Sequence, residues 1–105
     1  MKPTKRDWKI FQEMLPDLRD RYLAEQNQTF MTILNSKERT PTEQFWDTYN
    51  AMKEQGKILR DCLDGFSKSK MDMHILLMLR YGIMKEEDLE VFGKELREWM
   101  EKVRR

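Results

Sequence analysis

His74 lies among three methionines, Met71, Met73 and Met78, and an imidazole with thioether side chains is a ligand set for haem or copper. Carboxylate metal sites in helical bundles place a Glu three residues before each ligand histidine, whereas Met71 occupies that position here. The chain has no second histidine, and one imidazole does not complete a typical transition-metal site. We therefore expect no metal and no cofactor, and interpret His74 as a structural residue and the methionines as flexible core filler.

Cys62 and the serines are the remaining candidate nucleophiles. Cys62 is the only cysteine, so an intrachain disulfide and a cysteine-rich zinc site are excluded. It falls on the apolar side of a predicted helix, where a buried thiol is ordinarily inert. Ser69 has the spacing of a helix cap, and the four glycines stand alone rather than in a phosphate-binding loop. We predict that the chain is not an enzyme.

The charge of the chain is balanced along its length. Twenty basic and nineteen acidic side chains leave a formal net charge of +1, with no basic tail or acidic block. Residues 71–92 have the outline of a helix-turn-helix, but the second helix begins with Glu86, Glu87 and Asp88, which would repel phosphates. We expect no binding to nucleic acid.

The sequence also argues against a membrane protein. The longest uninterrupted apolar run is Ile75 to Leu79, whereas a membrane-spanning helix needs about twenty residues. The N-terminal stretch meets Asp7, Gln12 and Glu13 before an apolar run of the kind found in signal peptides. With a single cysteine, a reducing and cytoplasmic setting is the simplest interpretation.

The elements that must position these residues are helices. Four segments show helical periodicity, and almost no sequence alternates in the manner of a strand. The predicted fold is all-α: a compact bundle of four main helices in one domain, 1–105, mostly antiparallel with short connections. The first helix begins with Thr4 as N-cap and continues to about Asn35. Pro16 removes an N–H and clashes with the preceding turn, so we expect a kink or a break near residues 13–16.

Three further helices follow. The second begins with Thr40 as N-cap and closes at Gly65. The third runs from a cap at Ser69 to Gly82, and the fourth begins at about Lys85. The second carries an apolar stripe about 100° wide with a weaker stripe beside it, so we expect this helix to contact two neighbouring helices. Its members are Phe45, Tyr49, Met52, Gly56, Leu59, Leu63 and Phe66. The fourth places Leu89, Phe92, Leu96, Trp99, Met100 and Val103 on one face.

Polar side chains interrupt the inward face of the first helix at Tyr22, Gln26 and Thr29. Buried polar groups must form hydrogen bonds, and such a cluster either fixes the helix register or lines a small pocket. The alternative is that the helix bends away after Pro16 and leaves these residues partly exposed. A ligand-binding bundle would use Tyr22, Gln26, Thr29, Tyr49 and His74 as polar lining.

The third helix is apolar nearly all round. Met71, Ile75, Met78 and Leu79 occupy one face, which suffices for a bundle core. Met73, Leu76 and Leu77 lie on the other side, where we expect a partner interface. The preferred function is a small non-catalytic cytoplasmic interaction or regulatory module that self-associates as a homo-oligomer or binds another protein. The ligand-binding bundle is the alternative.

Overall fold

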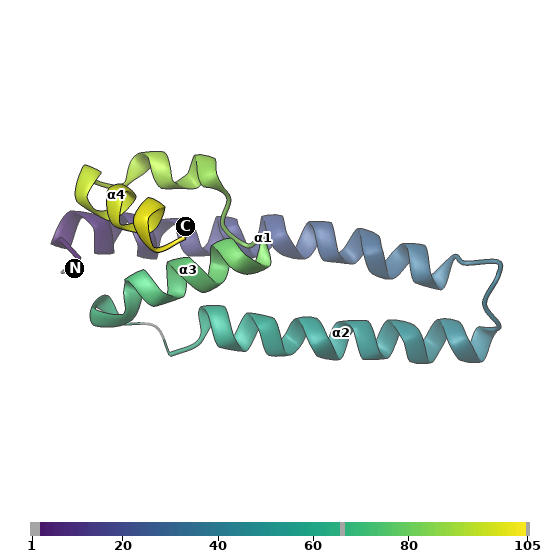
Figure 1. Cartoon of the computed structure of the whole chain (residues 1–105). Coiled ribbons are helices and arrows are strands. Elements are labelled where there is room, and N and C mark those ends of the chain that lie inside the picture. The colour runs from purple at the N-terminus through teal and green to yellow at the C-terminus, as the bar shows by residue number, and fades with distance from the viewer. Residues whose placement is uncertain (1–2, 66, 105) are drawn as a thin grey trace.

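The computed structural model describes residues 3–65 and 67–104 of the chain. This described part of the chain contains four α-helices: α1 (Lys5–Leu34), α2 (Pro41–Leu63), α3 (Met71–Tyr81) and α4 (Lys94–Val103). Two 3-10 segments, η1 (Lys68–Lys70) and η2 (Glu86–Val91), precede α3 and α4 (Figure 1). The described residues contain no strand. The predicted all-α fold of four main helices is confirmed.

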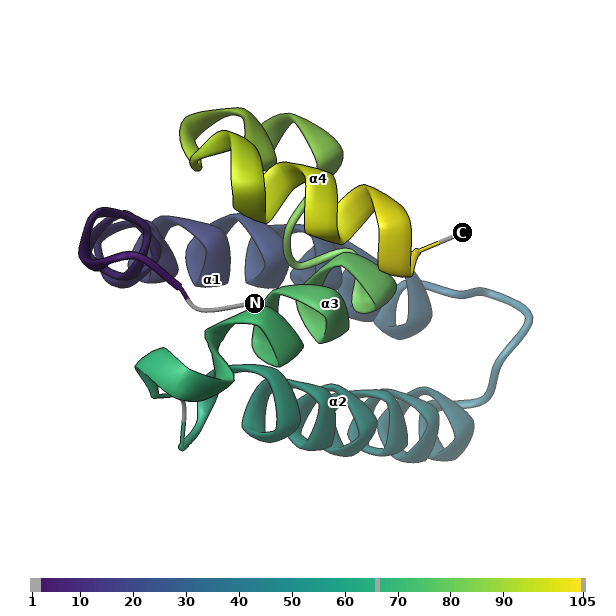
Figure 2. The ribbon, with the colours of Figure 1, turned by 60° about the vertical axis from the view of Figure 1, so that its left-hand side comes forward.

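The helices α1 and α2 form a long antiparallel hairpin, and the other elements pack at one end of it (Figure 1). There α3 lies between α2 and α4 (Figure 2). The chain measures 51 × 24 × 22 Å and has a radius of gyration of 16.6 Å, against about 13 Å for a compact domain of this length. The fold is more extended than the predicted compact bundle, because the hairpin projects beyond α3.

The predicted caps at the starts of α1 and α2 and at the end of α3 are confirmed. The Thr4 hydroxyl accepts the Asp7 N–H at 3.0 Å. Thr40 and Glu43 form both bonds of a capping box, at 3.2 and 2.9 Å. Gly82 follows α3 with φ +80°, a left-handed conformation that suits glycine.

We expected a kink or a break at Pro16; the helix α1 continues through this residue, so the break is absent and a kink stays a prediction. Pro16 cannot donate to the carbonyl of Gln12, but both residues are exposed, and water can satisfy that carbonyl. Phe11, Leu15 and Leu18 are buried on the opposite side of the helix. Their packing holds the turns before and after Pro16 in one helix.

The predicted cap at Ser69 is wrong. Ser69 lies inside the 3-10 segment η1, and its hydroxyl contacts that of Ser67 at 3.2 Å. The N–H of Lys70 already bonds to the carbonyl of Ser67, so the chain turns more tightly here than an N-cap allows. No side chain caps α3, and the Asp72 carboxylate accepts the Met73 N–H at 2.9 Å.

The predicted start of the fourth helix at Lys85 is also wrong. The 3-10 segment η2 comes first, the backbone is extended at Phe92 and Gly93, and α4 begins at Lys94. Gly93 disfavours helix, and its N–H donates to the Asp7 carboxylate of α1 at 2.9 Å. The interruption redirects the chain so that both parts bury apolar side chains. These are Leu89, Phe92, Leu96 and Met100.

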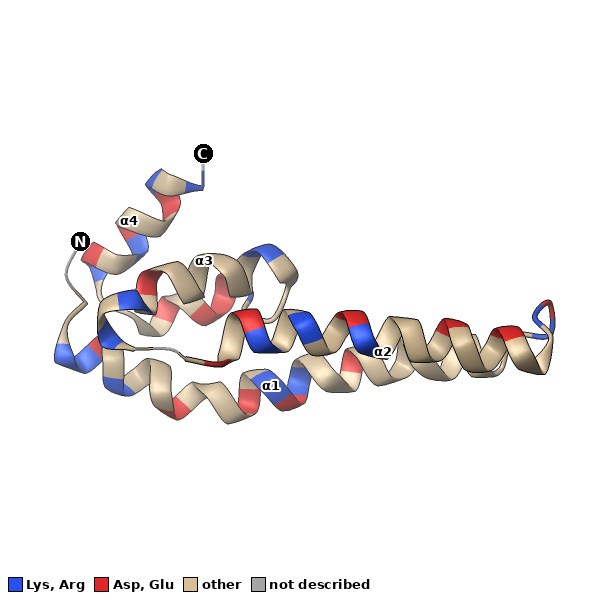
Figure 3. Ribbon diagram, turned by 90° about the horizontal axis from the view of Figure 1, so that it is seen from below, with Lys and Arg blue, Asp and Glu red and all other residues tan. Residues whose placement is uncertain are grey.

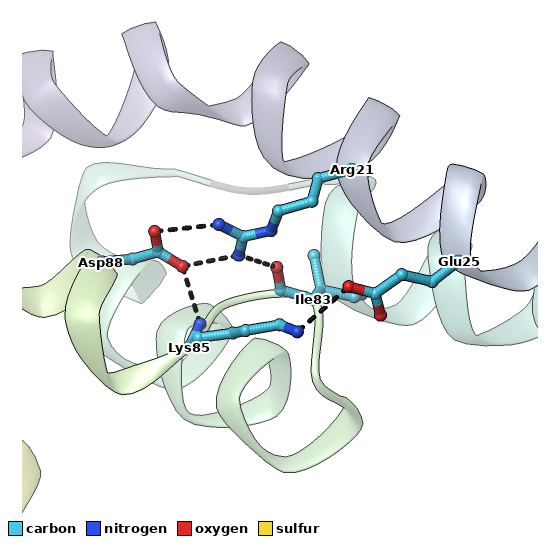
Figure 4. Close-up of polar contacts among 5 residues, drawn as sticks. All are labelled: Arg21, Glu25, Ile83, Lys85 and Asp88. Atoms are coloured by element: carbon cyan, nitrogen blue, oxygen red, sulfur yellow. Dashed lines mark hydrogen bonds and ion pairs between the residues drawn. The ribbon is translucent and has the colours of Figure 1, made fainter.

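Arg21 of α1 fastens the C-terminal segment to the hairpin (Figure 4). Its guanidinium donates to both carboxylate oxygens of Asp88, at 3.1 and 2.6 Å, and to the Ile83 carbonyl at 3.0 Å. Asp88 also accepts the backbone N–H of Lys85 at 2.7 Å, and the Lys85 ammonium pairs with Glu25 at 3.0 Å. These contacts fix η2 against the middle of α1.

Removing the charge of Asp88 should destabilise the fold in a pH-dependent way. The hydrogen bond from Arg21 lowers the pKa of the Asp88 carboxyl below its ordinary value, against the opposing effect of burial. The stabilisation is therefore complete above the unfolded pKa of about 4 and is lost as pH falls through the folded pKa. At pH 7 we expect Asp88→Asn to lower the free energy of unfolding by about 1–2 kcal/mol in urea melts.

The matched control is Glu98→Gln, which breaks an exposed pair with Lys94 at 3.7 Å and should change stability little. The difference between wild type and Asp88→Asn should shrink on acidification. A difference that is constant from pH 7 to pH 3 would contradict the role given to the ionised carboxylate.

Candidate interaction surface

The apolar stripe of α2 is buried at its C-terminal end and exposed to solvent at its N-terminal end. Phe45 and Leu63 lie about five whole turns apart, so they fall on one line along the helix. Leu63 is 4% exposed and belongs to the core, whereas Phe45 is 58% exposed. Phe66, the last residue of the predicted stripe, lies outside the described residues. The bare part of the stripe therefore lies on the projecting part of the hairpin.

Side chains from both helices widen this bare part into a surface that we call the hairpin face. Its six large apolar residues are all between 45% and 58% exposed. They are Met31 and Leu34 of α1, and Phe45, Trp46, Tyr49 and Met52 of α2. Four of them, Leu34, Phe45, Tyr49 and Met52, line a hollow of about 230 Å³ together with Thr48. Leu34 of α1 and the α2 residues thus contribute to one surface, and Met31, which precedes Leu34 by three residues on α1, lines a separate hollow beside it.

Three aromatic rings of the hairpin face pack edge to face. The Phe45 and Trp46 ring centroids lie 5.0 Å apart with an interplanar angle of 88°. Those of Trp46 and Tyr49 lie 5.7 Å apart at 82°. Edge-to-face pairs of this kind are favourable, so the rings restrain one another before anything binds.

The projecting part of the hairpin carries little charge for a chain with 37% charged residues. Residues 26–36 contain no Lys, Arg, Asp or Glu. On α2, Asp47 is paired with Arg39 at 2.9 Å. The ribbon of the projecting part is accordingly mostly tan in Figure 3. Depletion of charge together with aromatic and Met side chains is typical of the centre of protein interfaces.

Polar contacts join α2 to α1 and to the connection that follows α1, and so set the register that presents the hairpin face. The Tyr22 hydroxyl bonds to the side-chain carbonyl of Gln55. Nearer the connection, the Gln44 amide donates to the Ser36 carbonyl at 2.8 Å. Between these pairs, the buried Thr48 hydroxyl has no hydrogen-bond partner among the described residues.

The predicted partner interface on α3 is only partly accessible. Met73 is 55% exposed, whereas Leu76 and Leu77 are partly buried and pack against the core. The three residues share one helix, as predicted. Their contact with a partner stays a prediction, and the hairpin face is the larger bare apolar surface.

The five predicted ligand-lining residues lie in different surroundings. Tyr22 is buried, Gln26 is half-buried and Thr29 is exposed. Tyr49 belongs to the hairpin face, whose hollow none of the other four lines. His74 is buried, and its Nδ1 lies 2.9 Å from the Cys62 carbonyl oxygen. Because a carbonyl only accepts, Nδ1 carries the proton. A pocket formed by these five stays a prediction.

The described residues offer no clustered metal ligands and no membrane span. No group of three or more His, Cys, Asp or Glu side chains in this part of the chain is placed to hold a metal ion. No helix there is both long and apolar enough to cross a membrane.

Sequence reasoning missed the hairpin face as a surface. It assigned Phe45, Tyr49 and Met52 to a stripe in contact with neighbouring helices, and did not single out Met31, Leu34 or Trp46. Two signals were present. Trp46 falls outside the stripe although it is large and apolar, and the uncharged run of residues 26–36 is long for so charged a chain.

Comparison with known proteins assigns no family to the chain. No protein-family model matches it, and no match is found among curated proteins or solved structures.

The Cys62 thiol should be unreactive in the folded protein. Burial, with repulsion from Asp61, raises the pKa of this thiol to about 11. At pH 8 only about one thousandth of such a thiol is thiolate, the form that reacts. We expect alkylation by iodoacetamide to be roughly 100-fold slower than at the exposed position of a Ser69→Cys variant, as followed by mass spectrometry. In urea the two cysteines should be alkylated at similar rates. Similar alkylation rates in the folded protein would contradict the burial of Cys62.

Replacing Thr48 by Val, which has the same shape, should stabilise the hairpin. A buried hydroxyl without a partner lowers stability, and Val removes it without leaving a cavity. We expect the free energy of unfolding to rise by about 0.5–1 kcal/mol in urea melts. Thr42→Val at an exposed position of the same helix is the control and should change little. A loss of stability in Thr48→Val would show that the hydroxyl is hydrogen-bonded in solution.

Proposed function

We propose that the protein is a small, non-catalytic interaction module that binds another polypeptide through the hairpin face. The observation that carries the proposal is the α2 stripe, which enters the core at Leu63 and continues uncovered to Phe45. A contiguous exposed apolar patch on a small domain usually marks an interaction site. The chain thus presents part of a packing surface that no described residue covers.

We propose a non-catalytic protein because its two most reactive side chains, the Cys62 thiol and the His74 imidazole, are buried. The Cys62 thiol is fully buried, and burial raises its pKa to about 11. The His74 ring is buried, and its Nδ1–H donates to the Cys62 backbone carbonyl. A thiol in these surroundings is a poor nucleophile. A cytoplasmic location, also part of the proposal, agrees with a free cysteine.

Site-specific photo-cross-linking tests the proposal even though the partner is unidentified. A benzophenone amino acid replaces Tyr49 in cells that normally make the protein, and irradiation is followed by denaturing gels and mass spectrometry. We expect a cross-linked polypeptide at this position. The matched control places the same group at Met73, which is similarly exposed but lies on α3.

Cross-links to polypeptide at Tyr49 and not at Met73 would support the hairpin face as the binding surface. Adducts to polypeptide only from Met73 would instead favour the interface predicted on α3. Adducts only to lipid at Tyr49, or none above background, would overturn the proposal.

A further inference from the structure

We infer that the occupant of the hairpin face is a second copy of this chain, packed antiparallel to the first about a two-fold axis near Tyr49. The inference rests on the proposed function and names its partner. Three observations lead to it: the area of the face, the chemistry of its polar surroundings, and the cover at its inner end.

The area of the hairpin face suits a symmetric dimer. Six side chains, each about half exposed, present on the order of 100 Å² apiece. The face therefore offers about 600 Å² of mostly apolar surface, close to the 800 Å² or so that each partner contributes to a specific interface. Two copies of this face would complete an interface of ordinary size, because a two-fold axis pairs a surface with itself.

The polar residues around the face are compatible with a copy of themselves. Residues 26–36 supply amides and hydroxyls rather than charges. Such groups both donate and accept hydrogen bonds, so like residues can pair across a two-fold axis. A face ringed by charges of one sign would repel its own copy. At this end of the hairpin Arg39 and Asp47 form an ion pair within the chain, at 2.9 Å.

The helices that pack over the Leu63 end of α2 determine how two copies can be oriented. Because Leu63 is buried on the same line of α2 as the exposed Phe45, other parts of the fold stand above this line at Leu63. In a parallel pair these covering parts would meet first and hold the two faces about a helix diameter, 10 Å, apart. In an antiparallel pair the helices that cover Leu63 in one copy lie beyond the hairpin connection of the other copy, so they do not collide. The four projecting helix segments then form a four-helix bundle.

Sedimentation equilibrium of the purified full chain tests whether the partner is a second copy. We expect twice the monomer mass for the wild type. Tyr49→Asp should raise the dissociation constant by roughly 30-fold or more, the effect of a central interface residue, while circular dichroism shows unchanged helicity. Phe45→Asp, at an even more exposed position, provides a second variant if Tyr49→Asp loses helicity.

Met73→Asp is the matched control, because it places the same charge on a similarly exposed apolar residue outside the hairpin face. It should leave the dimer intact. A monomeric wild type would overturn the second copy as occupant, and cross-links from Tyr49 to a different polypeptide would then leave the proposed function standing. Dissociation by Met73→Asp but not by Tyr49→Asp would move the interface to α3.

Spin labels test the orientation. Lys9 is exposed near the start of α1, about 20 residues before the level of Tyr49, so an antiparallel dimer places two Lys9→Cys labels about 60 Å apart. A parallel dimer places them within about 30 Å. The buried Cys62 of the unmodified chain should take no label, which serves as the control. A distance in the shorter range would overturn the antiparallel arrangement.

Discussion

The difference in length between the helices governs the form of this molecule. The hairpin helices α1 and α2 have 30 and 23 residues, whereas α3 and α4 have 11 and 10. At about 1.5 Å per residue the short helices reach along roughly 16 Å of a hairpin that exceeds 30 Å. A stripe that repeats regularly along α2 is therefore buried at Leu63 and bare at Phe45. The core and the hairpin face are two parts of one sequence pattern.

The parts of the fold that sequence predicts are those whose causes are local. The capping box of Thr40 and Glu43 involves groups three residues apart, and the left-handed turn at Gly82 depends on that residue alone. The errors arise from contacts between distant segments. The N–H of Gly93 bonds to the Asp7 carboxylate from the other end of the chain, and this bond helps to end η2 and start α4. No local sequence pattern in either segment predicts that contact.

The hairpin face was also missed because its exposure depends on which distant helices pack against it. Helical periodicity identifies the stripe but does not say which neighbour covers each residue, so it predicts for Tyr49 a helix contact that the fold does not supply. For α3 the periodicity indicates an open apolar side, yet Leu76 and Leu77 pack against the core because the short helix sits between α2 and α4. The predicted fourth helix, from about Lys85 to Val103, was longer than the observed α4 of 10 residues, so the predicted lengths did not reveal this either. Two long helices and two short ones cannot cover each other along their full length.

The projecting part of the hairpin has few interactions of its own. Of residues 23–54, all of which the structure describes, only Phe30 and Thr48 are buried. Two helices without a substantial shared core gain little stability from their pairing, since helices in water depend on tertiary packing. The register here comes from polar contacts such as Tyr22 with Gln55. A partner on the hairpin face would bury half-exposed aromatic rings and so stabilise the folded hairpin by mass action. The scarcity of internal packing that leaves the face exposed is therefore also the reason why a bound partner would add stability to the hairpin.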